Sequence, residues 1–346
     1  MSLRLIGLRC LSQRQYATSA VKPNIKLLAK LRQETEVSMS KAKEALVKND
    51  NDYDKALSWL AQDAQVSGAK KAQKVAGRTA GEGVISVASV TTDGAASKST
   101  IIELNCETDF VSRGDVFKNL ASRIAATSLL LHEASSANTL EHIPVESLLQ
   151  APLMPQEGSS SAAAAAEGPV GKTIQETIVE TIGKLGENIT LRRAAIAVVD
   201  GGASAAYVHG GDAATGKIGG IATIQPRSKE GLTEQTAEVL AKTARHVARQ
   251  AVGYNPRYLN AQDVPADELK AQADADAYLA ETVLTRQPFL LKPDVTVADY
   301  VDQTVKDAGL KDGAIVSNFI RWSVGEGIEK KENDFASEVM KAAQGN

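Results

Sequence analysis

The stretch Asn105-Cys106-Glu107-Thr108-Asp109-Phe110-Val111 joins the two kinds of regular structure that the rest of the chain repeats. Residues 100–106 are rich in β-branched side chains, which predicts a strand that ends within this stretch. Asp115, a few residues later, is suited to cap a helix. An aromatic ring at such a corner either turns inward to the core or is offered to something outside. Which of the two holds decides the function.

The strand over 100–106 is predicted to pair with residues 83–90 as an antiparallel hairpin, across a turn at 92–94. Since alternate strand residues face opposite sides, Ile102, Leu104 and Cys106 share one face of this strand. The helix after the corner has apolar or small residues at helical spacing, which predicts its inner stripe. These residues are Phe117, Leu120, Ala121, Ile124, Ser128 and Leu131.

The same order of elements returns later in the chain. Residues 207–209 and 218–224 predict a second hairpin around a glycine loop, and Thr233 can cap the long helix that follows. Between the two copies we expect a helix over 171–186 and a buried strand over 189–199. Because a hairpin followed by a helix occurs twice, the sequence predicts an α+β fold whose core is an internal duplication.

Residues 24–60 predict three short helices packed on one another, with Asp52 as the cap of the third. Such a unit resembles the ubiquitin-associated type of three-helix domain, a class that binds partners through a modest apolar patch. The lysines and the arginine of the following connector are more typical of a solvated helix face than of a nucleic-acid site.

The N-terminus has the composition of an organelle targeting segment. No acidic residue precedes Glu34, whereas Arg4, Arg9 and Arg14 alternate with leucines. We therefore expect a mitochondrial transit peptide and a mature protein in the mitochondrial matrix that begins near Ala17; a disordered cytosolic tail is the alternative. Removal of these three arginines leaves 36 basic and 42 acidic residues, a net charge of −6.

The predicted organisation follows from these segments. It consists of a transit peptide at 1–16, a ubiquitin-associated-like domain at 24–65, a basic connector at 66–82, core subdomains at 83–200 and 201–324, and a C-terminal module with a helix at 325–346. A Ser- and Ala-rich insertion at 156–168 interrupts the first core subdomain.

No motif for bond-making chemistry is complete. Residues 211–217 have the spacing of a phosphate-binding loop, but Ile218 stands where a magnesium-ligating Ser or Thr is needed, and a strand rather than a helix follows. We therefore interpret this loop as a hairpin turn, and His246 as a packing residue. Two cysteines and four dispersed histidines give no metal or cofactor motif, and the net charge of −3 indicates neither a nucleic-acid nor a membrane surface. Binding is favoured over catalysis.

Five ordered motifs resemble the signatures of the elongation factor Ts family. They are Leu31-Arg32-Gln33-Glu34-Thr35, Glu107-Thr108-Asp109-Phe110-Val111, Gly186-Glu187-Asn188-Ile189 with Arg192 and Arg193, Tyr207-Val208-His209-Gly210, and Phe319-Ile320-Arg321 through Val324-Gly325-Glu326-Gly327. The resemblance covers nearly everything from Asn24 onward. The sequence departs from the family pattern in two places. One is the Ser- and Ala-rich insertion at 156–168, and the other is residues 267–286, a segment too short for the coiled-coil protrusion of many bacterial members.

The resemblance implies a guanine-nucleotide exchange factor, not an enzyme, that binds mitochondrial elongation factor Tu in its GDP-bound and nucleotide-free forms and uses no cofactor. It assigns nucleotide release to Thr108, Asp109, Phe110 and Val111. Further partner contacts are expected at Met39, Tyr207, His209, Arg321 and Phe335, whereas the Gly186–Asn188 motif and the paired arginines could equally be structural. The alternatives are a ubiquitin-associated adaptor, an RNA-associated scaffold and a nucleotide hydrolase.

Overall fold

The computed structural model describes residues 21–35, 37, 39–92, 96–155 and 171–328. The chain divides into two compact units, Met1–Val66 and Ser67–Asn346. Helices and antiparallel sheets both occur, so the predicted α+β class is confirmed. The predicted transit peptide, the insertion at 156–168, and the terminal helix with Phe335 lie outside the described residues.

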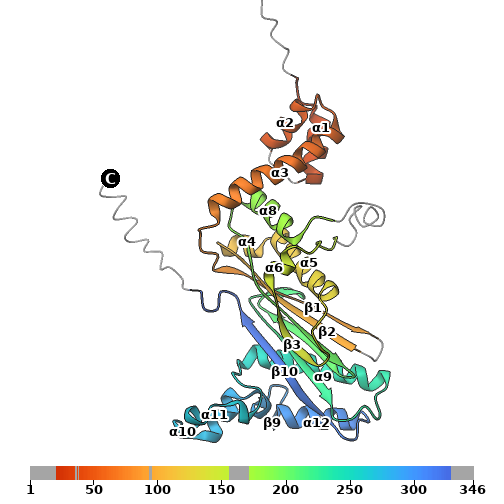
Figure 1. Cartoon of the computed structure of the whole chain (residues 1–346), viewed down its shortest axis with the longest axis vertical. Helices are drawn as coiled ribbons and strands as arrows, with labels where there is room; N and C mark the ends of the chain where they lie inside the picture. The colour runs from red at the N-terminus through yellow and green to blue at the C-terminus, as the bar shows by residue number, and fades with distance from the viewer. Residues whose placement is uncertain (1–20, 36, 38, 93–95, 156–170, 329–346) are drawn as a thin grey trace, which may run out of the picture. The chain divides into compact units, whose positions relative to one another are not determined.

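Figure 1 shows the elements in chain order. The helices are α1 (Ile25–Thr35), α2 (Met39–Lys48), α3 (Tyr53–Val75), α4 (Asp109–Arg113), α5 (Asp115–Leu131), α6 (Val145–Leu149), α8 (Ile174–Leu185), α9 (Glu234–Tyr254), η1 (Ala261–Asp263), α10 (Ala266–Lys270), α11 (Ala275–Thr282), η2 (Leu284–Arg286) and α12 (Val297–Asp307). The strands are β1 (Glu82–Thr92), β2 (Ala96–Cys106), β3 (Thr139–Ile143), β4 (Thr190–Asp200), β5 (Ala203–His209), β6 (Thr215–Gly216), β7 (Ile218–Pro226), β8 (Pro288–Phe289), β9 (Lys292–Thr296) and β10 (Ala314–Ser323).

The N-terminal unit contains the three predicted helices around a small core. Asp52 accepts a hydrogen bond from the Lys55 amide at 3.1 Å, which confirms it as the cap of α3. The buried side chains are small or aliphatic: Leu31, Ala42, Ala45, Leu46, Ala56 and Leu60. The third helix extends into the predicted basic connector and ends at Val75.

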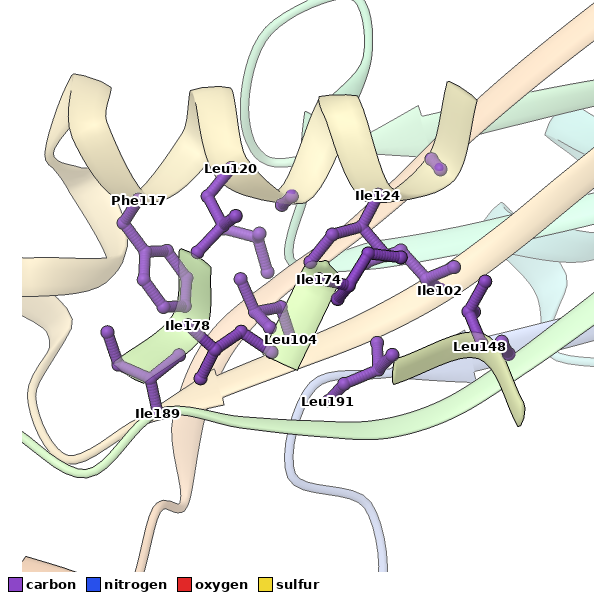
Figure 2. Packing of buried hydrophobic residues seen from close by; sticks show 14 of the residues in the cluster. Ile102, Leu104, Phe117, Leu120, Ile124, Leu148, Ile174, Ile178, Ile189 and Leu191 are labelled. Carbon is purple, nitrogen blue, oxygen red and sulfur yellow. The ribbon is translucent and has the colours of Figure 1, made fainter. Parts of the chain in front are cut away.

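The C-terminal unit is built on a five-stranded sheet of order β3-β4-β2-β1-β6. Ile102 on β2 pairs with Ser86 on one side and with Ala194 on the other. As predicted, Ile102, Leu104 and Cys106 belong to one core, which α5 and α8 cover. Figure 2 shows Phe117, Leu120 and Ile124 of α5 reaching toward the sheet residues and toward Ile174 and Ile178 of α8.

A second sheet, of order β10-β7-β5, packs against the opposite face of the first. Ile85, Ile101 and Ala195 of the first sheet share a buried cluster with Val208 and Ile221 of the second. Helices α9 and α12 cover the outer face of the second sheet. The C-terminal unit is therefore layered as helices, sheet, sheet and helices.

Two local expectations are corrected. Asp115 is not the cap of α5, because Gly114 occupies that position and Asp115 lies in the first turn, where its charge favours the helix dipole. Leu131 is 48% exposed, because the helix ends there and Leu129 is the buried residue of its last turn. Residues 265–286 form the short pieces α10, α11 and η2.

Candidate functional site

The corner after β2 carries an outward-facing aromatic side chain. Thr108 caps the one-turn helix α4, since its hydroxyl oxygen accepts a hydrogen bond from the Val111 amide at 3.4 Å. Val111 is buried in the core beneath α5, whereas Phe110 is 84% exposed. Successive helical residues are about 100° apart, so burial of Val111 turns Phe110 outward. The Phe110 ring therefore faces solvent and not the core.

Asp109 stands beside Phe110 and is also accessible. Its carboxylate pairs with Arg113 at 2.6 Å, and the two side chains are 54% and 75% exposed. An exposed pair of this spacing contributes only about 0.3–0.5 kcal/mol, so Asp109 can exchange this partner for another at little cost.

Glu187, in the loop after α8, holds the backbone that leads into α4. Its Oε2 atom accepts hydrogen bonds from the amides of Glu107 at 3.1 Å and Thr108 at 3.0 Å, while Oε1 accepts from the Thr108 hydroxyl at 2.6 Å. Gly186 makes this approach possible by ending α8 in a left-handed conformation, with a φ of 79°.

A second carboxylate, that of Glu107, accepts a bond from the loop after α8 in return. Glu107 accepts a hydrogen bond from the Asn188 amide at 2.7 Å, and the Asn188 side chain donates to the Arg78 carbonyl at 2.8 Å. Residues 107–108 and 187–188 are thus joined reciprocally, and we call this set of bonds the Glu107–Glu187 clasp. Sequence reasoning left Glu187 outside the site, because its partner is 79 residues distant.

Lys217 supports α4 from the side of the second hairpin. Its ammonium group donates to Ser112 Oγ at 3.1 Å and to the Gly83 carbonyl at 3.0 Å. Asp212 ties the preceding turn by accepting from the Thr215 amide at 2.8 Å, and Ile218 begins β7. The interpretation of residues 211–217 as a hairpin turn is confirmed, because β5 and β7 on either side of them pair antiparallel. The lysine of the phosphate-loop-like motif bonds to Ser112 in α4.

Arg192 and Arg193 of β4 bind a buried carboxylate near the end of β2. Glu103 is fully buried and accepts from Arg193 Nε at 2.6 Å, Arg192 Nη1 at 3.1 Å and the Gly325 amide at 2.8 Å. Arg193 also donates to the Ser323 carbonyl at 3.2 Å. These bonds fix the turn through which the chain leaves β10.

Tyr207, His209 and Arg321 are brought to one face of the three-stranded sheet. Tyr207 of β5 and Arg321 of β10 both pair with Gly220 of β7, so Tyr207, Gly220 and Arg321 lie in one row across the sheet. His209 lies two residues beyond Tyr207 on β5 and therefore on the same face. Burial lowers the pKa of Arg321, whose Nε atom has no hydrogen-bond partner within the described part of the chain. Met39, half exposed at the start of α2, belongs to the other compact unit.

The remaining titratable candidates are packing groups. His246 Nδ1 lies 2.8 Å from the Tyr300 hydroxyl, which confirms its interpretation as a hydrogen-bonded packing residue. Burial, assisted by the nearby Lys242 and Arg249, lowers the pKa of His246. Burial and the Glu187 carboxylate raise the pKa of the Cys106 thiol to about 12.

Two properties of the described residues bear on the kind of site. These residues contain no group of three or more His, Cys, Asp or Glu side chains arranged to hold a metal ion. Within the same ranges, no helix has the length and apolar character needed to cross a membrane.

Comparison with known proteins first defines the class. A family model described as Elongation factor TS matches residues 107–275, a range that opens at the corner itself. The mitochondrial elongation factor Ts of Coprinopsis cinerea is 37% identical over 348 residues, covering 93% of this chain and 96% of that protein. The protein is thus a translation elongation factor.

Two further relatives narrow the assignment. The mitochondrial elongation factor Ts of Laccaria bicolor is 33% identical over 92% of this chain and 97% of its own, and the elongation factor Ts of Brucella anthropi is 33% identical over 92% and 98%. The chain belongs to the elongation factor Ts family, and its localisation is mitochondrial.

Proposed function

We propose that the protein binds elongation factor Tu–GDP in the mitochondrial matrix, disturbs its magnesium and phosphate site, and promotes GDP release. The observation that carries this proposal is the exposure of Phe110, 84%, on a one-turn helix whose neighbouring residue Val111 is buried. A large aromatic side chain held out in solvent by a fixed backbone suits a partner-binding anchor.

The physical task of an exchange factor is to favour the nucleotide-free form of its partner. GDP owes much of its affinity to backbone amides around the phosphates and to a magnesium ion that bridges phosphate oxygens. A protein that binds the nucleotide-free form more tightly weakens GDP by the same factor, because the coupling is reciprocal. A thousandfold effect needs about 4 kcal/mol of differential binding, which a buried aromatic anchor and its surroundings can supply.

The corner residues divide this task between them. Phe110 enters an apolar crevice of the partner, and Asp109 disturbs the hydrogen bonds that position the magnesium ion. The weak, exposed pairing of Asp109 with Arg113 supports this role, since the carboxylate can be redirected. Thr108 is exposed beside Asp109, so it contacts the partner as well as capping α4. Val111 is buried and contributes by anchoring α4 in the core.

Further partner surfaces and the finer organisation belong to the same proposal. The ubiquitin-associated-like helices, with Met39, and the C-terminal module, with Phe335, hold the nucleotide domain of the partner. Tyr207, His209 and Arg321 meet its other domains. A polar contact there is supported by the Arg321 Nε atom, which has no hydrogen-bond partner among the described residues. The recurrence of hairpin and long helix, β1–β2 with α5 and β5–β7 with α9, supports the duplication and the core boundary at 200–201.

A stopped-flow measurement of fluorescent GDP leaving elongation factor Tu tests the proposed function. We expect release to accelerate with increasing concentration of the protein, at least about a hundredfold, and no GTP hydrolysis by the protein alone. A binding adaptor, an RNA scaffold and a nucleotide hydrolase all predict an unchanged release rate, so an unchanged rate would refute exchange activity.

A further inference from the structure

We infer that Glu187 is a positioning residue for nucleotide release: it fixes the direction in which α4 presents Asp109 and Phe110. The inference rests on the proposed function, because it concerns how the corner performs that task. Glu187 itself is in the loop after α8, outside the strand and helix that form the corner.

The Glu187 carboxylate accounts for the polar groups at the entrance to α4. Its two oxygens accept from two consecutive amides and from the Thr108 hydroxyl, at 3.0, 3.1 and 2.6 Å. The same hydroxyl oxygen accepts from the Val111 amide, so Thr108 links the carboxylate directly to the first turn of α4. Within the described residues Glu187 forms no ion pair with a lysine or arginine, so this corner is its bonding environment.

A helix of five residues has little stability of its own, because nucleation is unfavourable and few backbone bonds follow it. Its direction must therefore come from outside. Val111 anchors one face in the core, and Lys217 holds Ser112 near the end of the helix. Glu187 holds the start, and it alone among these three contacts binds the cap residue next to Asp109.

Rigidity at this start matters because the Phe110 side chain is 84% exposed and therefore gains little orientation from its own packing. An anchor fixed in its binding direction loses less conformational entropy on association and delivers more of its binding energy to the partner. The other half of the clasp, Glu107 with Asn188 and Arg78, ties the loop after α8 to the core without touching α4. The Glu107 half of the clasp is therefore a structural contact, whereas the Glu187 half positions α4.

The test compares Glu187→Ala and Glu187→Gln with the wild-type protein in stopped-flow GDP release from elongation factor Tu. For Glu187→Ala we expect the maximal rate to fall about 10- to 100-fold, and the half-saturating concentration to change less than about threefold. Glu187→Gln keeps one oxygen for the two amides and should stay within about fivefold of wild type. Glu180→Ala, which removes an α8 carboxylate paired with Lys172 and Lys184, is the matched control and should be unchanged.

A double variant keeps the inference testable if Glu187→Ala also lowers stability. If Glu187 acts through Asp109 and Phe110, adding Glu187→Ala to the Asp109→Ala, Phe110→Ala double variant should slow release no further, within about twofold. Losses that multiply, or a Glu187→Ala rate equal to wild type, overturn the inference and leave exchange activity intact. Failure of the wild-type protein to accelerate release overturns both, and it is recognised before any variant is compared.

Discussion

Glu103 provides the sharpest test of how β2, β4 and the turn after β10 are held together. Glu103→Ala removes a fully buried carboxylate that accepts hydrogen bonds from Arg192, Arg193 and the Gly325 amide. It leaves two guanidinium groups, 28% and 23% exposed, without their buried partner. Glu103 is fully buried, so the substitution itself removes no exposed atom from the corner that carries Asp109 and Phe110.

The expected loss follows from this burial. Removing one partner of a buried ion pair costs about 3–5 kcal/mol, because the remaining charges are partly withheld from water. Partial hydration of the two arginines places the expected loss in free energy of unfolding near the lower end of that range. Glu103→Gln keeps the side-chain shape but turns an NH₂ group toward the arginines, so it should lose nearly as much.

Urea unfolding at pH 7 measures this loss in the core itself. The chain has two tryptophans, Trp59 in α3 and Trp322 in β10, so a Trp59→Phe background leaves Trp322 as the single fluorescent reporter. Trp322 is well placed, because the Arg193 guanidinium lies 4.4 Å from the centre of its ring.

A matched control separates buried from exposed charge. Asp200, on the same strand as the two arginines, pairs with Lys229 at 2.9 Å, and their side chains are 49% and 67% exposed. Asp200→Ala should cost no more than about 1 kcal/mol. If Glu103→Ala and Asp200→Ala lose the same small amount, the reasoning about the buried carboxylate is wrong.

The remaining predictions concern pH and backbone packing. The folded state lowers the pKa of His246, so the neutral side chain contributes fully to stability above its ordinary pKa of 6.5, and this contribution is lost as the pH falls below that value. His246→Asn removes the titrating group and can retain the bond to Tyr300. The urea midpoints at pH 7.5 and pH 5 should therefore differ less in His246→Asn than in wild type. Gly219→Ala would place a methyl group 2.5 Å from Ile85 Cγ2 between the sheets and should cost about 1–3 kcal/mol in thermal unfolding. Gly253→Ala in α9 meets no atom within 4 Å and should instead add about 0.5–1 kcal/mol; equal shifts of the two variants would contradict the close approach of the sheets.

Local periodicity predicted most of the regular structure because burial follows the repeat of each element. The alternation along 100–106 and the spacing of Phe117, Leu120 and Ile124 each predicted which residues face the core. Thr233 was identified as a cap because its bond to the Thr236 amide is made within three residues.

The parts that sequence could not predict depend on contacts between distant residues. The outward direction of Phe110 depends on Val111 entering the core, and a single helical turn has too few residues for a periodic pattern. Glu187 and Lys217 reach the corner from 79 and 105 residues away, so the local motifs that contain them do not indicate that they contact it. Burial of Glu103 requires the pairing of β2 with β4, which the hairpin pattern alone does not specify.

The most direct test of the central claim is the GDP-release rate of Phe110→Ala with elongation factor Tu. Because this side chain is 84% exposed, its truncation should change the free energy of unfolding by less than about 0.5 kcal/mol. Leu131→Ala, which removes another exposed apolar side chain, is the control. The account predicts a loss of at least about tenfold in the maximal rate for Phe110→Ala and wild-type behaviour for Leu131→Ala; a wild-type rate for Phe110→Ala would contradict it.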